Sequence, residues 1–235
     1  MSDLELAGVS VAYGDRPVVT GVDLTVAAGQ TVAVLGPSGC GKSTLLRAIA
    51  GIEPLIAGRI CLAGTDLAGV PTYRRGIGLM FQEAALFEHL DVFGNVAFGL
   101  RMQRQPRSAI GDRVTQMLTL VGLAEHGSSP VAELSGGERQ RVALARTLAP
   151  APGVVLLDEP LGALDQALRR ELIGVLADAF TATGATVVQV THDQAEAFAL
   201  ADRVAVMRDG RVVRVDSPAA IMADPGDEWV ADFLR

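Results

Sequence analysis

The sequence is organised around one glycine-rich stretch, Gly36-Pro37-Ser38-Gly39-Cys40-Gly41-Lys42-Ser43-Thr44. It matches the pattern G-x-x-x-x-G-K-[ST], with an apolar run at residues 31–35 before it and a helical pattern at residues 42–50 after it. Glycines let the backbone curl until successive N–H groups face phosphate oxygens, and the N-terminus of the following helix adds partial positive charge. We therefore predict that these nine residues bind the phosphates of a nucleotide.

Two side chains of this stretch have specific expected roles. Lys42 is predicted to reach the β and γ phosphates, and the hydroxyl of Ser43 is predicted to bind Mg²⁺. Lys42 is the only lysine in the chain, so a flexible point charge occurs only where a phosphate site uses one. An ordinary glycine-rich turn is the competing structural interpretation.

Strand and helix patterns on both sides of this stretch predict an α/β fold. Its core is a P-loop NTPase core with a parallel sheet, preceded by an antiparallel β subdomain at the N-terminus. Apolar residues recur at helical spacing between about residues 84 and 148, which predicts an inserted α-helical subdomain. The predicted strands are residues 4–11, 18–26, 31–35, 58–62, 77–81, 154–157, 186–190 and 203–207, and the clearest helices of the core are residues 42–50 and 166–180.

Composition excludes several other classes of protein. The 235 residues are 49% hydrophobic and 20% charged, unlike a disordered chain, and the net charge of −7 disfavours a general nucleic-acid binder. Two cysteines, Cys40 and Cys61, are too few for a disulfide scaffold. The acidic N-terminus lacks the pattern of a signal peptide, and glycines interrupt the longest uncharged stretch, so we expect a cytoplasmic protein without a membrane span.

The apolar run at residues 154–157 ends in two acids, Asp158 and Glu159. At the carboxyl end of a strand beside a phosphate loop, the first acid can hold Mg²⁺ through its water, and the second can orient or deprotonate an attacking water. Strands often end in acidic residues, so this pair alone is weak evidence for a hydrolytic site. Together with the glycine-rich stretch it makes nucleotide hydrolysis the leading hypothesis.

A second candidate anion site precedes the helical pattern at residues 142–148. Ser135, Gly136 and Gly137 stand at its start, where a serine hydroxyl and free backbone N–H groups can bind an anion. An ordinary helix cap explains the serine equally well. On the residues alone, both interpretations stay open.

With these motifs, the sequence resembles the ATP-binding subunits of ABC transporters over nearly its whole length. The run Leu134-Ser135-Gly136-Gly137-Glu138 matches the signature of that family, which is far more specific than a phosphate loop. Further motifs follow in the family's order at Gln82, at the pair Leu164-Asp165 and at His192. The resemblance implies a single ABC ATPase domain over residues 1–235, with the helical subdomain at about residues 84–148.

The resemblance also implies a head-to-tail dimer that encloses two ATP molecules. Lys42, Ser43 and Asp158 of one subunit would hold the nucleotide and Mg²⁺. Ser135-Gly136-Gly137 of the other subunit would close over its γ-phosphate. A homodimer is expected, and a second subunit would explain the second anion site.

Further residues take roles from the same resemblance. Glu159 would be the general base, Gln82 would contact Mg²⁺ and the attacking water, and His192 would contact the γ-phosphate. Asp165 would link the two sites across the dimer, and Tyr13 would stack on adenine. The competing interpretations are surface packing for Tyr13, a helix cap for Asp165 and a structural imidazole for His192.

The segment from Phe81 to Leu100 is similar to ATPases of bacterial importers for ferric iron, thiamine, polyamines, sulfate and related solutes. In that group it receives an integral membrane permease, so Leu86 and Phe87 are expected to line a docking groove on a peripheral, membrane-associated protein. Packing within the helical subdomain is the competing interpretation of these two residues. Glu88 and Gly94 replace the proline and glutamate of many relatives, which affects groove shape. A solute-binding protein is an expected further partner, and nucleic acid is not. The alternatives are an ABC exporter ATPase and a soluble, non-transport ABC ATPase.

Overall fold

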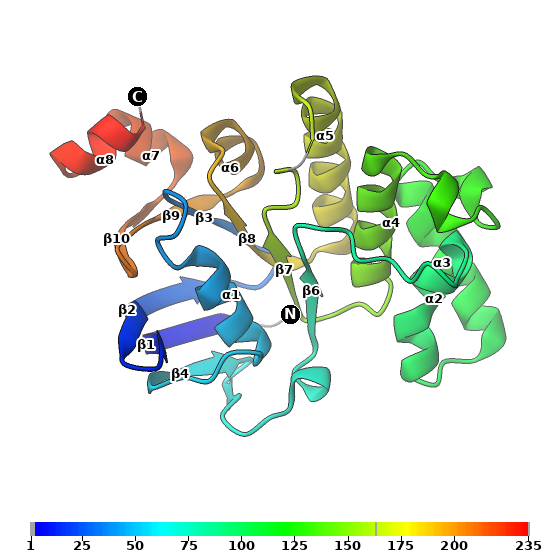
Figure 1. Ribbon diagram of the computed structural model, residues 1–235, viewed down its shortest axis with the longest axis horizontal. Coiled ribbons are helices and arrows are strands. Elements are labelled where there is room, and N and C mark those ends of the chain that lie inside the picture. Colours follow the sequence, from blue (N-terminus) through cyan, green and yellow to red (C-terminus); the bar gives the residue numbers. More distant parts are fainter. Residues whose placement is uncertain (1–2, 163, 235) are drawn as a thin grey trace.

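The structure is a computed structural model that describes residues 3–162 and 164–234. An N-terminal β layer, a central sheet and a group of helices lie side by side, with the C-terminal helices at the opposite end from that group (Figure 1). The strands are β1 (Leu4–Tyr13), β2 (Arg16–Val26), β3 (Thr31–Leu35), β4 (Ala57–Leu62), β5 (Thr65–Asp66), β6 (Ile77–Met80), β7 (Val154–Asp158), β8 (Thr186–Thr191), β9 (Arg203–Arg208) and β10 (Arg211–Asp216). The helices are α1 (Lys42–Ala50), α2 (Val92–Met102), α3 (Arg107–Leu120), α4 (Gly136–Leu148), α5 (Gln166–Thr183), α6 (Gln194–Leu200), α7 (Pro218–Ala223) and α8 (Glu228–Phe233).

The N-terminal strands form an antiparallel sheet in the order β2-β1-β4-β5. At the start of β1, Leu4 and Leu6 are buried while Glu5 between them is exposed, the alternation expected of a sheet with one dry face. Leu4 lies opposite Val26 of β2 and Leu62 of β4, so β1 lies between these two strands. The predicted N-terminal antiparallel sheet is therefore confirmed.

The central sheet has the strand order β10-β9-β3-β8-β7-β6, and the pairings from β9 to β6 are parallel. Every residue of β3, β7 and β8 is buried, as expected for parallel strands that are covered on both faces. Alternate residues serve the two faces. Val32 and Val34 pack in the same core as α1, whereas Ala33 and Leu35 pack in the core beneath α6. The predicted P-loop core with a parallel sheet is confirmed.

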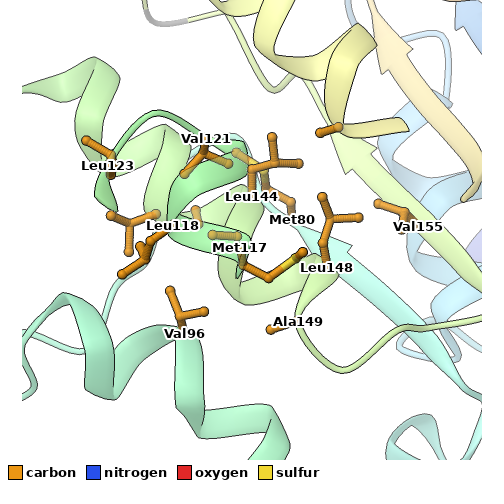
Figure 2. Packing of buried hydrophobic residues seen from close by; sticks show 14 of the residues in the cluster. Met80, Val96, Met117, Leu118, Val121, Leu123, Leu144, Leu148, Ala149 and Val155 are labelled. Atoms are coloured by element: carbon orange, nitrogen blue, oxygen red, sulfur yellow. The ribbon is translucent and has the colours of Figure 1, made fainter. Parts of the chain in front are cut away.

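Helices α2, α3 and α4 pack together beside the β6 edge of the sheet. In α2 the buried Val92, Val96 and Leu100 recur at intervals of four residues, which places them on one face. They share one core with the sheet residues Met80 and Val155, part of which Figure 2 shows. This apolar core packs the group of helices against the β6 edge of the sheet.

Several elements differ from the sequence expectation. The helix expected at residues 166–180 continues to Thr183, where Gly184 with φ 60° ends it. The strand expected at residues 77–81 ends at Met80, and the short elements β5, β10 and α6 were not predicted. The strand β10 lies at the sheet edge, where its pattern RVVRVD lacks a clean alternation. Within the described residues, no helix combines the length and apolar character needed to cross a membrane.

Candidate functional site

The glycine-rich stretch lies between β3 and α1, as the sequence predicts. Two of its glycines have no room for a side chain: a Cβ on Gly36 would lie 2.3 Å from the carbonyl oxygen of Met207, and one on Gly41 would lie 2.7 Å from that of Val18. Gly41 also has φ 105°, a conformation that favours glycine. Gly41 caps α1 without a side-chain hydrogen bond, so the first N–H groups of α1 are available to an anion.

The side chain of Lys42 turns back into this loop. Lys42 is 4% exposed, and its Nζ donates hydrogen bonds to the carbonyls of Gly36 (2.8 Å) and Pro37 (3.0 Å). An ammonium has three N–H donors, so one remains for an anion that enters the loop. The lysine therefore holds the loop in shape and carries the positive charge that a phosphate needs.

Ser43 and Asp158 meet although 115 residues separate them. The Ser43 hydroxyl donates a 2.7 Å hydrogen bond to Oδ1 of Asp158, which the last residue of β7 presents at the end of the sheet. A hydroxyl and a carboxylate are hard oxygen donors that fit Mg²⁺, an ion that commonly binds through one or two carboxylates plus phosphates and water. The predicted pair is brought together, and its role in metal binding stays a prediction.

Glu159, His192 and Gln82 follow the ends of β7, β8 and β6, respectively. Glu159 has φ 46°, an uncommon conformation for a residue other than glycine, and its N–H donates to the carbonyl of Val190 (2.9 Å). Its Oε2 lies 3.2 Å from Nδ1 of His192. A Cβ on Gly162 would lie 3.3 Å from Oε2 of Glu159 and 3.4 Å from Nε2 of Gln82. Gly162 thus leaves the space that these two polar groups share.

The backbone of Gln82 is tied to the helical subdomain. Its carbonyl accepts a 2.9 Å hydrogen bond from Nε2 of Gln140 in α4, while the residue itself is exposed. Gln82, which lies near Glu159, is therefore hydrogen-bonded through its backbone to helix α4. Sequence reasoning did not identify Gln140, because a glutamine within a helical pattern carries no local signal.

Ser135 caps α4, and the cap is a complete capping box. Its Oγ accepts from the N–H of Glu138 (3.3 Å), and the Glu138 carboxylate accepts from the N–H of Ser135 (2.8 Å) and from its hydroxyl (2.7 Å). These hydrogen bonds from Ser135 hold the pKa of the Glu138 carboxyl below its usual value. The helix-cap interpretation of Ser135 is confirmed, while a contact with phosphate stays a prediction.

The signature residues lie beside α5 and away from the phosphate loop of the same chain. A Cβ on Gly137 would lie 2.8 Å from the side chain of Leu168, and one on Gly136 would lie 4.0 Å from that of Leu164. Figure 1 places α4 and α1 on different sides of β6 and β7. Within residues 3–162 and 164–234, no hydrogen bond links Ser135 to residues 36–44. One copy of the chain therefore does not bring the two anion sites together.

Asp165 is the N-cap of α5. Its Oδ1 accepts hydrogen bonds from the N–H groups of Ala167 (2.9 Å) and Leu168 (3.0 Å), and the residue is exposed. The helix-cap interpretation is confirmed. The cap is compatible with a second role, because an exposed carboxylate next to the signature residues also faces any partner that covers them.

Tyr13 is 46% exposed at the end of β1, and its hydroxyl donates a 2.9 Å hydrogen bond to Glu53. Stacking on adenine stays a prediction for its ring. A cavity of about 310 Å³ beside the phosphate loop is lined by residues that the sequence did not suggest, including Arg16 and Asp209. Arg16 begins β2 and Asp209 lies in the turn after β9, and neither belongs to a motif, so only the folded chain brings them next to Ser38 and Gly39.

A glycine-rich loop between β3 and α1, an acid pair at the end of β7 and helices at the sheet edge define a P-loop ATPase fold of the ABC type. The chain belongs to the ABC transporter family, which it matches over residues 19–162. The predicted family and fold class are confirmed, and ATP binding follows from that membership.

Curated relatives cover nearly all of this chain. It is 55% identical over 231 residues to the Fe(3+) ions import ATP-binding protein FbpC of Streptomyces avermitilis, covering 98% of this chain and 67% of that protein. It is 47% identical over 232 residues to the spermidine/putrescine import ATP-binding protein PotA of a Nostoc species, covering 99% of this chain and 61% of that protein. The chain thus spans about two thirds or less of these relatives' length.

A solved structure agrees with the whole fold. The protein cbiO1 from Clostridium perfringens, described as part of the ABC transporter complex cbiONQ, matches with a TM-score of 0.87 at 30% identity, covering 94% of this chain and 91% of that chain. The arrangement of the two sheets and the helical group is therefore that of an ABC ATPase.

Proposed function

We propose that the chain is the ATP-hydrolysing subunit of a bacterial ABC importer, with residues 84–148 as its helical subdomain. Two copies close on two ATP molecules and drive a separate membrane permease. The observation that carries this proposal is the convergence of Lys42, Ser43, Asp158 and Glu159 at one end of the central sheet. These groups supply phosphate binding, an oxygen site for a metal and a candidate base within one region.

The phosphate loop binds the nucleotide in this mechanism. Residues 36–44 direct backbone N–H groups at the β and γ phosphates, and Lys42 adds its third N–H donor. Ser43 and Asp158 would hold Mg²⁺, which would supply positive charge against the charge that develops on the phosphate oxygens. Tyr13 stacks on the adenine ring.

Glu159 acts on the attacking water. Its carboxylate accepts a proton from that water while the water oxygen bonds to the γ-phosphorus and the bond to the β–γ bridging oxygen breaks, which releases ADP and phosphate. Gln82 orients the water and would help to hold the metal. The 3.2 Å contact to Nδ1 of His192 holds the Glu159 carboxylate in place, while His192 also contacts the γ-phosphate.

A second copy completes each site. Ser135, Gly136 and Gly137 of one subunit close over the γ-phosphate bound by the other, and Asp165 lies at the junction. Support comes from the separation of the two anion sites within one chain and from the packing of Gly137 against Leu168 of α5. Binding across two copies brings together what a single fold keeps apart.

An exposed apolar surface beside α2 fits the permease. We define the docking surface as Phe87, Phe98 and Met102; the rings of Phe87 and Phe98 lie 4.6 Å apart, and Met102 is 66% exposed. Arg146 supports it, with its guanidinium 5.5 Å from the Phe87 ring centroid and hydrogen bonds to the carbonyls of residues 84 and 85. Leu86, which the sequence also suggested, is partly buried and packs against the core of the helical group.

The departures Glu88 and Gly94 have different structural consequences. Glu88 is exposed next to the docking surface. The N–H of Gly94 donates to the N-cap Asp91 (2.6 Å), and a Cβ there would lie 2.9 Å from the same carboxylate. A glutamate at residue 94 would therefore require the Asp91 side chain to shift at the start of α2.

The names of the relatives support import, with ferric iron or a polyamine as the solute class. They do not favour an exporter or a soluble, non-transport ATPase. The thiamine group remains a third solute class, suggested by the sequence alone. The proposal places the protein in the cytoplasm, on the inner face of the membrane, with a solute-binding protein as a further partner of the complex.

Co-purification from membranes tests this proposal. We expect the tagged chain, isolated from gently solubilised membranes of its source cells, to carry a multi-span permease that mass spectrometry identifies. Met102→Asp should release the permease. The matched control is Met222→Asp, since Met222 is 58% exposed on α7, away from the docking surface, and should retain it. Recovery of only soluble or nucleic-acid-linked partners would count against a transporter.

A further inference from the structure

Arg169, in the first turn of α5, connects two loops of the site. Its Nη1 donates a 2.6 Å hydrogen bond to Oδ2 of Asp193, and its Nη2 donates a 3.2 Å hydrogen bond to the carbonyl of Leu164. Asp193 directly follows His192, and Leu164 directly precedes Asp165. One guanidinium thus joins the loop of the predicted γ-phosphate contact to the segment predicted to face the second subunit.

Asp193 is itself firmly held. Its Oδ1 accepts from the N–H of Glu196 (3.0 Å) as the N-cap of α6. Burial alone would raise the pKa of the Asp193 carboxyl, but hydrogen bonds from the start of α6 and the neighbouring Arg169 hold it below the usual value. The carboxylate is therefore ionised at neutral pH and forms a charge-assisted pair with Arg169.

The other side of His192 is fixed through Thr191. The Thr191 hydroxyl accepts from the N–H of Asp193 (3.0 Å) and donates to Oε2 of Glu196 (3.0 Å), and Glu196 is 1% exposed. The residues on both sides of His192 are thus anchored to α6. A displacement of Asp193 moves the backbone that carries the imidazole.

We propose that Arg169 is a positioning residue, whose simultaneous bonds to Asp193 and to the Leu164 carbonyl hold His192 against Glu159 and fix that pair relative to Asp165. The planar guanidinium suits this task, since it presents donors to two acceptors in a fixed geometry. The inference rests on the proposed ATP hydrolysis at Glu159. It assigns Arg169 no contact with the nucleotide.

The test is a set of Arg169 variants assayed for ATP binding and for ATP turnover. Arg169→Met should reduce turnover about tenfold, while affinity for a fluorescent ATP analogue changes less than about twofold, because the phosphate loop is untouched. Arg169→Lys keeps the positive charge but not the two-pronged guanidinium, so its turnover should lie between those of wild type and Arg169→Met. The matched control Arg170→Met removes an exposed arginine from the next position and should behave like wild type.

A double variant separates positioning from general stability. If Arg169 acts through His192, Arg169→Met added to His192→Ala should reduce single-turnover phosphate release by no more than about twofold beyond His192→Ala alone. Should Arg169→Met not fold, Asp193→Asn removes the ion pair while its amide oxygen still caps α6, and the same loss of turnover is expected.

Two results would overturn the inference: turnover of Arg169→Met equal to that of Arg170→Met, or losses from Arg169→Met and His192→Ala that multiply. Wild type and Glu159→Gln in the same assay report separately on the proposed function. Active wild type, inactive Glu159→Gln and unaffected Arg169→Met would refute the positioning role alone. If neither Glu159→Gln nor Arg169→Met loses hydrolysis, both the proposed function and the positioning role are refuted.

Discussion

Glu196 offers a quantitative test, because it is a buried carboxyl group with only part of its hydrogen bonding satisfied. The hydroxyl of Thr191 donates to Oε2, whereas Oε1 is buried and has no partner within the described part of the chain. Burial raises the pKa of Glu196 from 4.5 to about 7, and the charges of Asp193 and Glu159 add to the effect, against the hydrogen bond from Thr191 and the charge of Arg169.

The sign of the pH dependence follows from proton binding. Since the folded chain holds this proton more tightly than the unfolded chain, the stabilising effect is complete below pH 4.5 and is lost as the pH rises through about 7. A rise of the pKa from 4.5 to about 7, at about 1.4 kcal/mol per pH unit, corresponds to about 3 kcal/mol. Ionised Glu196 therefore destabilises the fold at pH 8.

Glu196→Gln removes this ionisation and keeps the size of the side chain. We expect it to raise the free energy of unfolding at pH 8 by up to about 3 kcal/mol, with most of the gain absent at pH 5. Urea unfolding followed by circular dichroism at both pH values measures this, with the exposed Glu5→Gln on β1 as the matched control. An equal gain at the two pH values, or a loss of stability at pH 8, would show that the carboxylate is well compensated in the folded chain.

Three further predictions concern the nucleotide site. Lys42→Ala should weaken binding of a fluorescent ATP analogue by about 100-fold, since it removes a charge-assisted contact of about 3 kcal/mol, and unchanged affinity in a titration would argue against its contact with phosphate. Burial raises the pKa of the Cys40 thiol, so iodoacetamide at pH 8 should modify Cys40 more slowly than the half-buried Cys61. Bound ATP should slow the modification of Cys40 further. Peptide mass spectrometry measures both rates, and a Cys40 rate that ATP does not change would contradict the placement of Cys40 in the phosphate loop. Glu138→Gln retains the capping box with Ser135 and removes a negative charge there, so sedimentation should show tighter ATP-dependent dimers, whereas weaker ones would contradict a phosphate contact at this serine.

The parts of the site that local sequence encodes were predictable. The glycine-rich stretch places Lys42 and Ser43 at the start of a helix because its residue types are required by that backbone path, as the crowding at Gly36 and Gly41 shows. The apolar run before Asp158 likewise predicts its place at a strand end. In such cases, the chemistry and the fold depend on neighbours in sequence.

The contacts between distant segments were not predictable without alignment to a structure. Arg169 and Asp193 stand 24 residues apart, in a helix and a loop whose relative positions depend on the packing of α5 and α6 on the sheet. Gln140 meets the carbonyl of Gln82 across 58 residues for the same reason. Periodicity predicts which face of a helix is buried, but not which polar side chain reaches a particular carbonyl.

Local signals also account for the caps at Ser135 and Asp165, for which a second role is proposed. The spacing of Ser135 and Glu138 is that of a capping box, and Asp165 stands where an N-cap is expected, and the structure has both caps. Caps and anion sites use the same free N–H groups at the start of a helix, so one sequence pattern is compatible with both. Only a second subunit with bound nucleotide distinguishes them.

Hydrolysis by wild type and by Glu159→Gln, measured in parallel with ATP binding, tests the proposed mechanism most directly. We expect wild type to release phosphate from ATP, and Glu159→Gln to bind the ATP analogue with unchanged affinity while its turnover falls by about 100-fold or more, since a general base is lost. Phosphate release by Glu159→Gln at the wild-type rate would contradict the assignment of Glu159 as the base.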